Sequence, residues 1–144
     1  MTDIRPPLLG TMETALYADD LTAATAFWQD VMGLTAFQTV PGRHVFFRIG
    51  DTPHPQVLLV FRAEATERPA PPDARLPVPS HGARGPGHFC MAVGRDHIDD
   101  WCRHLQSHDV GIEADFHWPN GARSIYFRDP AGNSIELAEP SLWA

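Results

Sequence analysis

Two ionisable side chains stand at strand-like positions where an unpartnered charge is unfavourable. His88 begins the apolar run of GPGHFCMAV, residues 85–93. Glu136 lies between Ile135 and Leu137 in NSIELAEP. Imidazole titrates near neutral pH and is a common metal ligand, and a carboxylate that faces inward needs a partner. Alternation puts Glu136 on the face opposite its apolar neighbours, which is either a wet cavity or the outer surface. Taken alone, His88 fits an ordinary strand histidine better than a functional one.

Further side chains are candidates for the lining of such a cavity. An arginine at the start of RSIYF can hold a carboxylate bidentately, although it equally fits a charge that protects a sheet edge. The aromatic candidates form either a cavity wall or part of the core, and a histidine before VFFRI can act as an acid or base. These candidate substrate-binding residues are Arg123, Trp118, Tyr126, His44 and Phe47.

The elements that must position these residues begin with a strand in METALYADDL and a helix after it. Asp20 is the expected N-cap of that helix. Apolar residues then recur at spacings of three and four through LTAATAFWQDVMGL, which is typical of one buried helical face. Gly33 is the expected C-cap. Two strand-like runs, HVFFRIG and QVLLVFR, follow a linker that contains Pro41 and Gly42.

The composition then changes. Residues 67–87, ERPAPPDARLPVPSHGARGPG, are rich in proline and cannot hold regular structure. The segment is either a linker or a loop over a site, and His81 within it is either a group at the cavity mouth or, as the loop composition favours, a solvated residue. Beyond it the same order returns: a strand HFCMAV, a helix over 96–112, and the strands RSIYFRD and NSIELAEP.

Sequence offsets indicate that the two halves repeat each other. An offset of 75 pairs Glu13 with His88, and an offset of 77 pairs Leu59 with Glu136. A third offset, 80, pairs FFRIGD with YFRDPAG. Three similar offsets in the right order predict duplicated units, each made of a strand, a helix and two or three further strands.

Composition limits the class of protein. The chain has 144 residues, 43% of them hydrophobic, which predicts one domain with a real core. Its net charge of −7 argues against nucleic-acid binding and mildly favours a cationic ligand. No run is long enough to span a membrane or resembles a secretory signal, so we expect a cytoplasmic protein. Cys90 and Cys102 have no disulfide or metal-site spacing and are expected to be core residues.

The chain resembles the vicinal oxygen chelate superfamily of glyoxalases, bleomycin-resistance proteins and extradiol dioxygenases. The resemblance is carried by ETALYADDLTAATAFWQDVMGL, GPGHFCMAV and RSIYFRDPAGNSIELAEP. It implies an α+β fold in which two βαβββ modules form sheets curled around a cavity. The chain is then a single domain, 1–144, with a first module at 8–63, a proline-rich linker at 64–86 and a second module at 87–140.

The same resemblance implies a metal site. Its ligand positions fall on Glu13, His88 and Glu136, and the fourth position falls near Leu59, which cannot bind metal. The usual residue at the first position is His or Gln, so Glu13 departs from the pattern. One imidazole and two carboxylates suit zinc, nickel, manganese, iron or cobalt. Glu13 and Glu136 are also the candidate catalytic residues.

The implied function is that of a metal-dependent lyase, isomerase or dioxygenase that acts on a small substrate with vicinal oxygens. Extradiol cleavage is less favoured, because it usually draws on two His ligands. The alternative is a metal-free protein of the bleomycin-resistance type, which sequesters a cationic drug and fits the acidic charge. Chains of this size in the superfamily are commonly homodimers, so we expect a homodimer whose modules pair within or between chains.

Overall fold

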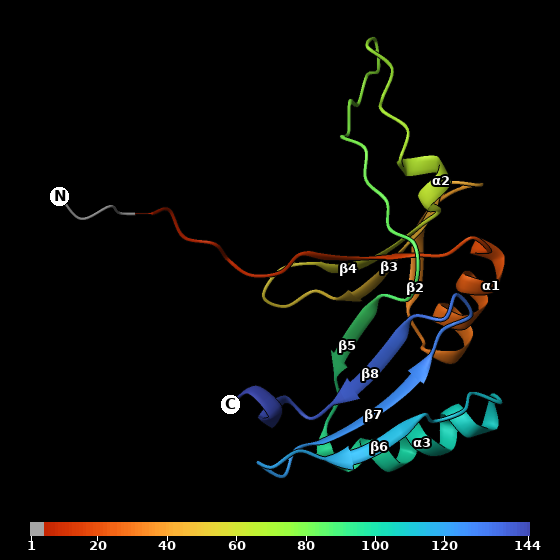
Figure 1. Cartoon of the computed structure of the whole chain (residues 1–144). Coiled ribbons are helices and arrows are strands. Elements are labelled where there is room, and N and C mark those ends of the chain that lie inside the picture. The colour runs from red at the N-terminus through yellow and green to blue at the C-terminus, as the bar shows by residue number, and fades with distance from the viewer. Residues whose placement is uncertain (1–4) are drawn as a thin grey trace.

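A computed structural model of the chain describes residues 5–144, and its strands form two four-stranded mixed sheets (Figure 1). The first sheet has the order β1-β4-β3-β2 and the second the order β5-β8-β7-β6. The strands of the first are β1 (Glu13–Tyr17), β2 (Thr35–Val40), β3 (His44–Gly50) and β4 (Gln56–Phe61). Those of the second are β5 (His88–Ala92), β6 (Ala114–His117), β7 (Arg123–Arg128) and β8 (Ser134–Ala138).

The two sheets are built in the same way. In each, the first strand runs parallel to the last strand and the other neighbours are antiparallel. A parallel pair needs a crossover connection, and the helix with its two following strands supplies it in both halves. The expected fold of paired βαβββ modules is therefore confirmed.

The helices begin and end close to the predicted signals. Asp20 caps α1 (Leu21–Ala26), since its carboxylate accepts a hydrogen bond from the amide of Ala23 at 2.9 Å. The helix continues as a π-helical turn, η1 (Phe27–Val31), and Gly33 follows it with a φ of +76°. In the second half a 3₁₀ turn, η2 (Arg95–His97), leads into α3 (Ile98–Ser107).

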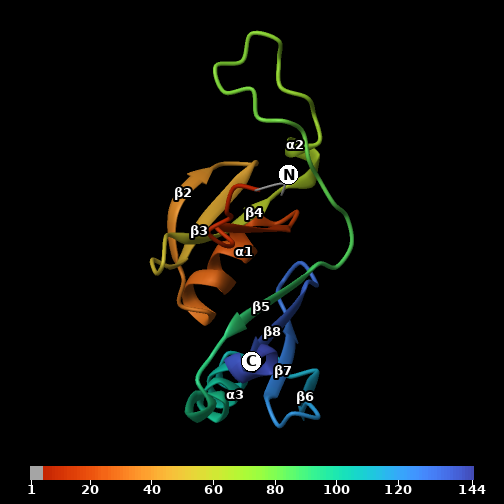
Figure 2. The same cartoon turned by 90° about the vertical axis from the view of Figure 1, so that its left-hand side faces the viewer.

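One core joins the two modules on the helical side of both sheets. Phe27 packs against Phe127 with ring centroids 6.4 Å apart, and Trp28 against Phe89 at 6.0 Å. These side chains belong to one continuous cluster that also includes Leu105 of α3. In Figures 1 and 2, α1 and α3 lie on one side of their sheets, and neither of these two helices covers the other face of either sheet.

Two strands and one short helix lie where the sequence pattern indicated none. Strands β2 and β6 are edge strands whose residues are mostly exposed, so they carry no alternation of apolar and polar residues. The short helix α2 (Ala63–Thr66) precedes the proline-rich segment. We call residues 67–87 the strap: it leaves the body beyond α2 and returns along the sheets to β5 (Figure 1). The chain ends in a 3₁₀ turn, η3 (Pro140–Trp143).

Within residues 5–144, no helix has the length and apolar character needed to cross a membrane.

Candidate functional site

The uncovered face of the second sheet holds a buried carboxylate. Glu136 on β8 is only 4% exposed. Its Oε2 accepts a hydrogen bond from the hydroxyl of Ser124 on β7 at 2.7 Å, and its Oε1 lies 3.2 Å from Nε2 of His88 on β5. Three strands therefore position this cluster, and the parallel register of β5 against β8 brings His88 to Glu136. The sequence prediction that Glu136 lies opposite Ile135 and Leu137 is confirmed, because both of those side chains are in the core.

The tautomer of His88 is fixed by its other nitrogen. Nδ1 lies 2.9 Å from the carbonyl oxygen of Ser134, and a carbonyl only accepts, so Nδ1 must donate. The neutral ring then presents the Nε2 lone pair to the Glu136 carboxylate, where two acceptors face each other. A cation between them relieves that repulsion, as does a second proton on the ring. A ring N–H held by a backbone carbonyl is also the usual arrangement around metal-binding histidines.

Aromatic side chains surround this cluster. Trp118 donates its indole N–H to the Ser124 hydroxyl at 2.8 Å, which leaves that hydroxyl free to donate to Glu136. Tyr126 stacks on His88 with ring centroids 6.1 Å apart. Burial and the adjacent Glu136 carboxylate raise the pKa of Tyr126 to about 12, so its hydroxyl stays protonated at neutral pH. The structure thus places Trp118 and Tyr126 at the uncovered face.

Cys90 also lies on this face, so its predicted core position is wrong. It alternates with Phe89, whose side chain is buried, and is itself exposed beside Glu136. Desolvation of the thiol and the neighbouring carboxylate raise its pKa to about 12, which keeps the sulfur protonated and unreactive at neutral pH. Cys102 on α3 packs partly buried against the core, as predicted.

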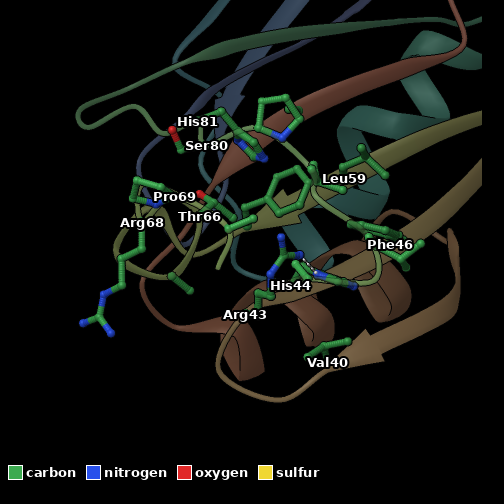
Figure 3. A pocket seen from close by; sticks show the side chains of 18 of the residues that line it. Val40, Arg43, His44, Phe46, Leu59, Thr66, Arg68, Pro69, Ser80 and His81 are labelled. Carbon is green, nitrogen blue, oxygen red and sulfur yellow. Dashed lines mark hydrogen bonds between the residues drawn. The ribbon is translucent and has the colours of Figure 1, made fainter. Parts of the chain in front are cut away.

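The uncovered face of the first sheet forms a groove of about 1260 Å³ (Figure 3). Glu13 at the start of β1 lies at its wall, exposed and without a hydrogen bond to any residue in 5–144. Leu59 on β4 lines it further along, and strap residues from Arg68 to His81 form its roof. Apolar side chains make up most of its wall.

The far end of the groove is built around His44 on β3. The guanidinium of Arg43 donates to His44 Nδ1 at 2.7 Å, as Figure 3 shows by a dashed line. Desolvation and the positive charge of Arg43 lower the pKa of His44, so the imidazole is neutral at pH 7. Its ring stacks on Phe46 with centroids 4.0 Å apart. The structure thus places His44 in the groove.

Phe47, by contrast, is not at the groove. It is fully buried in the core on the helical side of β3, because neighbouring strand residues point to opposite faces. The aromatic side chain that β3 contributes to the groove is that of Phe46. The expectation that Phe47 contacts substrate is therefore corrected, and its core-packing alternative holds.

Arg123 also lies away from both uncovered faces. Its guanidinium donates two hydrogen bonds to Asp115 on β6, at 2.8 and 2.9 Å, and one to Asp99 on α3 at 2.7 Å. It alternates with Ser124 and so points to the helical side of β7. These hydrogen bonds connect β6 and α3 to β7. Arg123 therefore has a structural role, and its expected role in substrate binding is corrected.

A contact that the sequence pattern did not favour connects the strap to the first sheet. The Tyr17 hydroxyl lies 2.6 Å from Nδ1 of His81, although 64 residues separate them. The His81 ring also packs edge-on against Phe61 at 4.6 Å. His81 is thus held over the groove rather than solvated, and no local sequence signal could place it there.

The structure brings together two of the three expected metal ligands. His88 and Glu136 meet on the second sheet, whereas Glu13 lies on the uncovered face of the first. Within one chain, residues 5–144 contain no group of three or more His, Cys, Asp or Glu side chains placed to hold a metal ion.

The fold and this arrangement can be compared with known proteins. A family model described as the Glyoxalase/Bleomycin resistance protein/Dioxygenase superfamily matches residues 11–137. The chain belongs to this superfamily. A search of curated proteins found no match.

Among solved structures, the superfamily member from Agrobacterium tumefaciens described as a lactoylglutathione lyase is 44% identical. The match covers 96% of this chain and 99% of that one, with a TM-score of 0.87. A glyoxalase/bleomycin resistance protein/dioxygenase from Nocardioides is 20% identical, over 96% of this chain and 86% of that one, with a TM-score of 0.69. A virulence protein from Salmonella typhimurium is 22% identical, over 93% and 98%, with a TM-score of 0.65. The last two similarities concern the fold alone.

Proposed function

We propose that this superfamily member is a metal-dependent lyase of the glyoxalase type, acting on a small substrate with vicinal oxygens, and that lactoylglutathione is the compound it forms or cleaves. The identity of 44% with the Agrobacterium protein, over nearly the whole of both chains, supports that reaction. The His88–Glu136 pair carries the proposal, since a fixed imidazole lone pair that faces a buried carboxylate favours a cation.

The residues present fit a divalent metal. His88 and Glu136 would hold it, with Glu13 as the third ligand, and this donor set suits zinc, nickel, manganese, iron or cobalt. When bound, the metal supplies positive charge to the two substrate oxygens and to the negative charge that develops on them. Ser124 keeps one oxygen of Glu136 occupied and so orients the other towards His88.

We further propose that a second copy of the chain completes the site. Glu13 and the His88–Glu136 pair lie on two sheet faces that neither α1 nor α3 covers. In a symmetric homodimer, the first sheet of one copy can face the second sheet of the other, which forms two equivalent sites. Large apolar side chains at the periphery are almost fully exposed in one chain and suit such an interface: Leu8, Leu9 and Trp143.

The two carboxylates then have different tasks. Glu136 is buried and held by Ser124, so it serves as a fixed ligand. The Glu13 carboxylate is exposed and accepts no hydrogen bond from residues 5–144. A free oxygen of Glu13 can therefore take a proton from a substrate carbon and return it to the neighbouring carbon, as a general base and acid.

The experiment measures thioester formation from methylglyoxal and glutathione, before and after chelation and with each metal restored. Glu13→Ala and Glu136→Ala are each expected to abolish it. Co-expressed in equal amounts, the two variants should recover about a quarter of wild-type activity, because half of the dimers are mixed and each holds one intact site. Absence of recovery would show that sites form within one chain.

A metal-free binding protein is the opposing outcome. Full ligand binding after chelation and in Glu136→Ala, with no thioester formed under any metal, would establish it. The net charge of −7 favours a cationic drug for such a protein, whereas the arginines that line the groove, Arg43 and Arg68, oppose one.

A further inference from the structure

We propose that the Arg43–His44 end of the groove binds the carboxylate of a small molecule whose body is flat and apolar. This inference goes beyond the proposed function, because the ligand is an aromatic carboxylate rather than a glutathione adduct.

Arg43 carries a positive charge that nothing described in the chain neutralises. Within residues 5–144, no carboxylate lies within 4.0 Å of its guanidinium. Its Nη1 donates to His44, and its planar group lies 5.9 Å from the centroid of the Phe61 ring. These contacts orient the guanidinium while leaving N–H groups without a partner on the other edge, and such an edge matches a carboxylate in geometry and charge.

His44 increases the preference for an anion without adding a competing charge. Because its Nδ1 accepts from Arg43, the neutral ring carries its proton on Nε2. His44 is buried and Arg43 is half-buried, so the His44 ring is held in place beside the guanidinium. Of the described residues that line the groove, the acidic one is Glu13, at the other end.

The walls select the body of the ligand. The parallel rings of His44 and Phe46 and the edge-on ring of Phe61 form one side of the groove. Strap residues such as Leu76 and Val78 form the roof of the groove. The apolar side chains of these two residues are exposed to solvent. A flat aromatic group buries this surface and stacks on the rings.

The separation of the two ends of the groove follows from the strand register. Glu13 pairs with Val57, and four residues further along, Tyr17 pairs with Phe61, which in turn pairs with His44. At about 3.3 Å per residue, His44 lies roughly 13 Å further along the strands than Glu13. Two strand spacings of about 4.8 Å across the sheet bring the separation to roughly 16 Å. A small aromatic carboxylate held at Arg43 therefore does not reach Glu13, and its binding can be measured separately from the reaction.

The test uses 2-naphthoate and its neutral analogue, 2-naphthamide, in calorimetric titrations of the full-length protein kept free of metal by chelator. We expect naphthoate to bind at least tenfold more tightly than naphthamide. Arg43→Gln should weaken naphthoate binding by about tenfold or more and leave naphthamide within about threefold, as expected for a lost charge-assisted hydrogen bond.

Two matched variants locate the effect. Arg68→Gln removes a cation from the groove rim, where its side chain points outward in Figure 3, and Arg103→Gln removes one from the surface of α3. Both should bind naphthoate like the wild type. Equal binding of the two probes, binding of neither, or equal weakening by Arg43→Gln and Arg68→Gln would each overturn the proposal. Since no metal is present, these failures are distinct from a failure of the proposed lyase reaction.

Discussion

The two uncovered sheet faces occupy equivalent places in a duplicated scaffold, yet they differ in polarity and order. The repeat pairs Glu13 with His88 and Leu59 with Glu136. On the second sheet these positions form a hydrogen-bonded cluster with Ser124, buried and fixed. On the first sheet the equivalent positions hold an exposed carboxylate and an apolar side chain within a wide groove.

The two halves of the repeat can therefore serve different roles in one site. A buried carboxylate needs several fixed partners, and β5, β7 and β8 supply them at the second sheet. Leu59 in place of a carboxylate removes that requirement from the first sheet, so its face can accept a large apolar surface. We infer that the second sheet holds charge in a fixed geometry while the first sheet holds the body of the ligand.

The largest effect should come from exchanging carboxylate for amide on each face. Glu136→Gln places an N–H₂ group against His88 or Ser124, and an amide donor at His88 occupies the Nε2 lone pair. We expect metal affinity to fall by about 100-fold or more, since even residues that only orient ligands contribute 10- to 100-fold.

Glu13→Gln is the matched change on the first sheet. Its amide oxygen remains a possible ligand and no fixed partner is lost, so metal affinity should fall by less than about tenfold. Calorimetric metal titration of both variants measures the contrast. Equal losses would contradict the division of tasks between the two faces.

A smaller effect, on stability rather than on binding, is expected from a substitution of Arg123, which lies just outside the second uncovered face. Arg123→Gln removes the bidentate pair with Asp115, on the helical side of β7, and should lower the free energy of unfolding by about 1 kcal/mol at pH 7. Substrate affinity should stay within about twofold of wild type, because Arg123 does not line either face. Urea unfolding and steady-state kinetics measure the two quantities.

The pH dependence of this loss identifies its cause. The hydrogen bonds from Arg123 lower the pKa of Asp115, so their stabilisation is present above the ordinary pKa and is lost as the pH falls through the lowered one. The difference between wild type and Arg123→Gln should therefore be full at pH 7 and shrink below about pH 4. Arg103→Gln, at an exposed pair with Asp100, should change stability by less than about 0.5 kcal/mol. A large change in substrate affinity would restore the expected role of Arg123.

Local patterns predicted most of the fold. The apolar helical face, the Asp20 cap and Gly33 lie within a few residues of one another and specify the first helix. Strands β2 and β6 were missed because an exposed edge strand carries no apolar alternation. The paired modules required the weak repeat and the resemblance to a known superfamily, because sheet pairing is non-local.

The candidate site was predicted in part. Alternation correctly assigned Glu136 to the face opposite the core, and the same rule applied to Phe47, Cys90 and Arg123 would have assigned each of them correctly. The contact of His88 with Glu136 depends on the β5–β8 register, and no local pattern encodes that. The position of His81 over Tyr17 depends on the path of a proline-rich strap and was likewise unpredictable.

The smallest effect concerns that strap, which has no counterpart over the second sheet. Tyr17→Phe removes the hydroxyl at 2.6 Å from His81 and leaves the ring contact with Phe61, so the strap should be held less tightly by about 1 kcal/mol. The His81 amide donates to the Thr66 carbonyl at 3.0 Å and reports on this contact. Its hydrogen exchange should accelerate about fivefold, while exchange in β8 stays unchanged. Tyr126→Phe on the second face is the matched control, because it removes a hydroxyl that the strap does not use. If both variants left the exchange of the His81 amide unchanged, the Tyr17–His81 hydrogen bond would contribute nothing to the position of the strap. The apolar contact between His81 and Phe61 would then hold the strap over the first face.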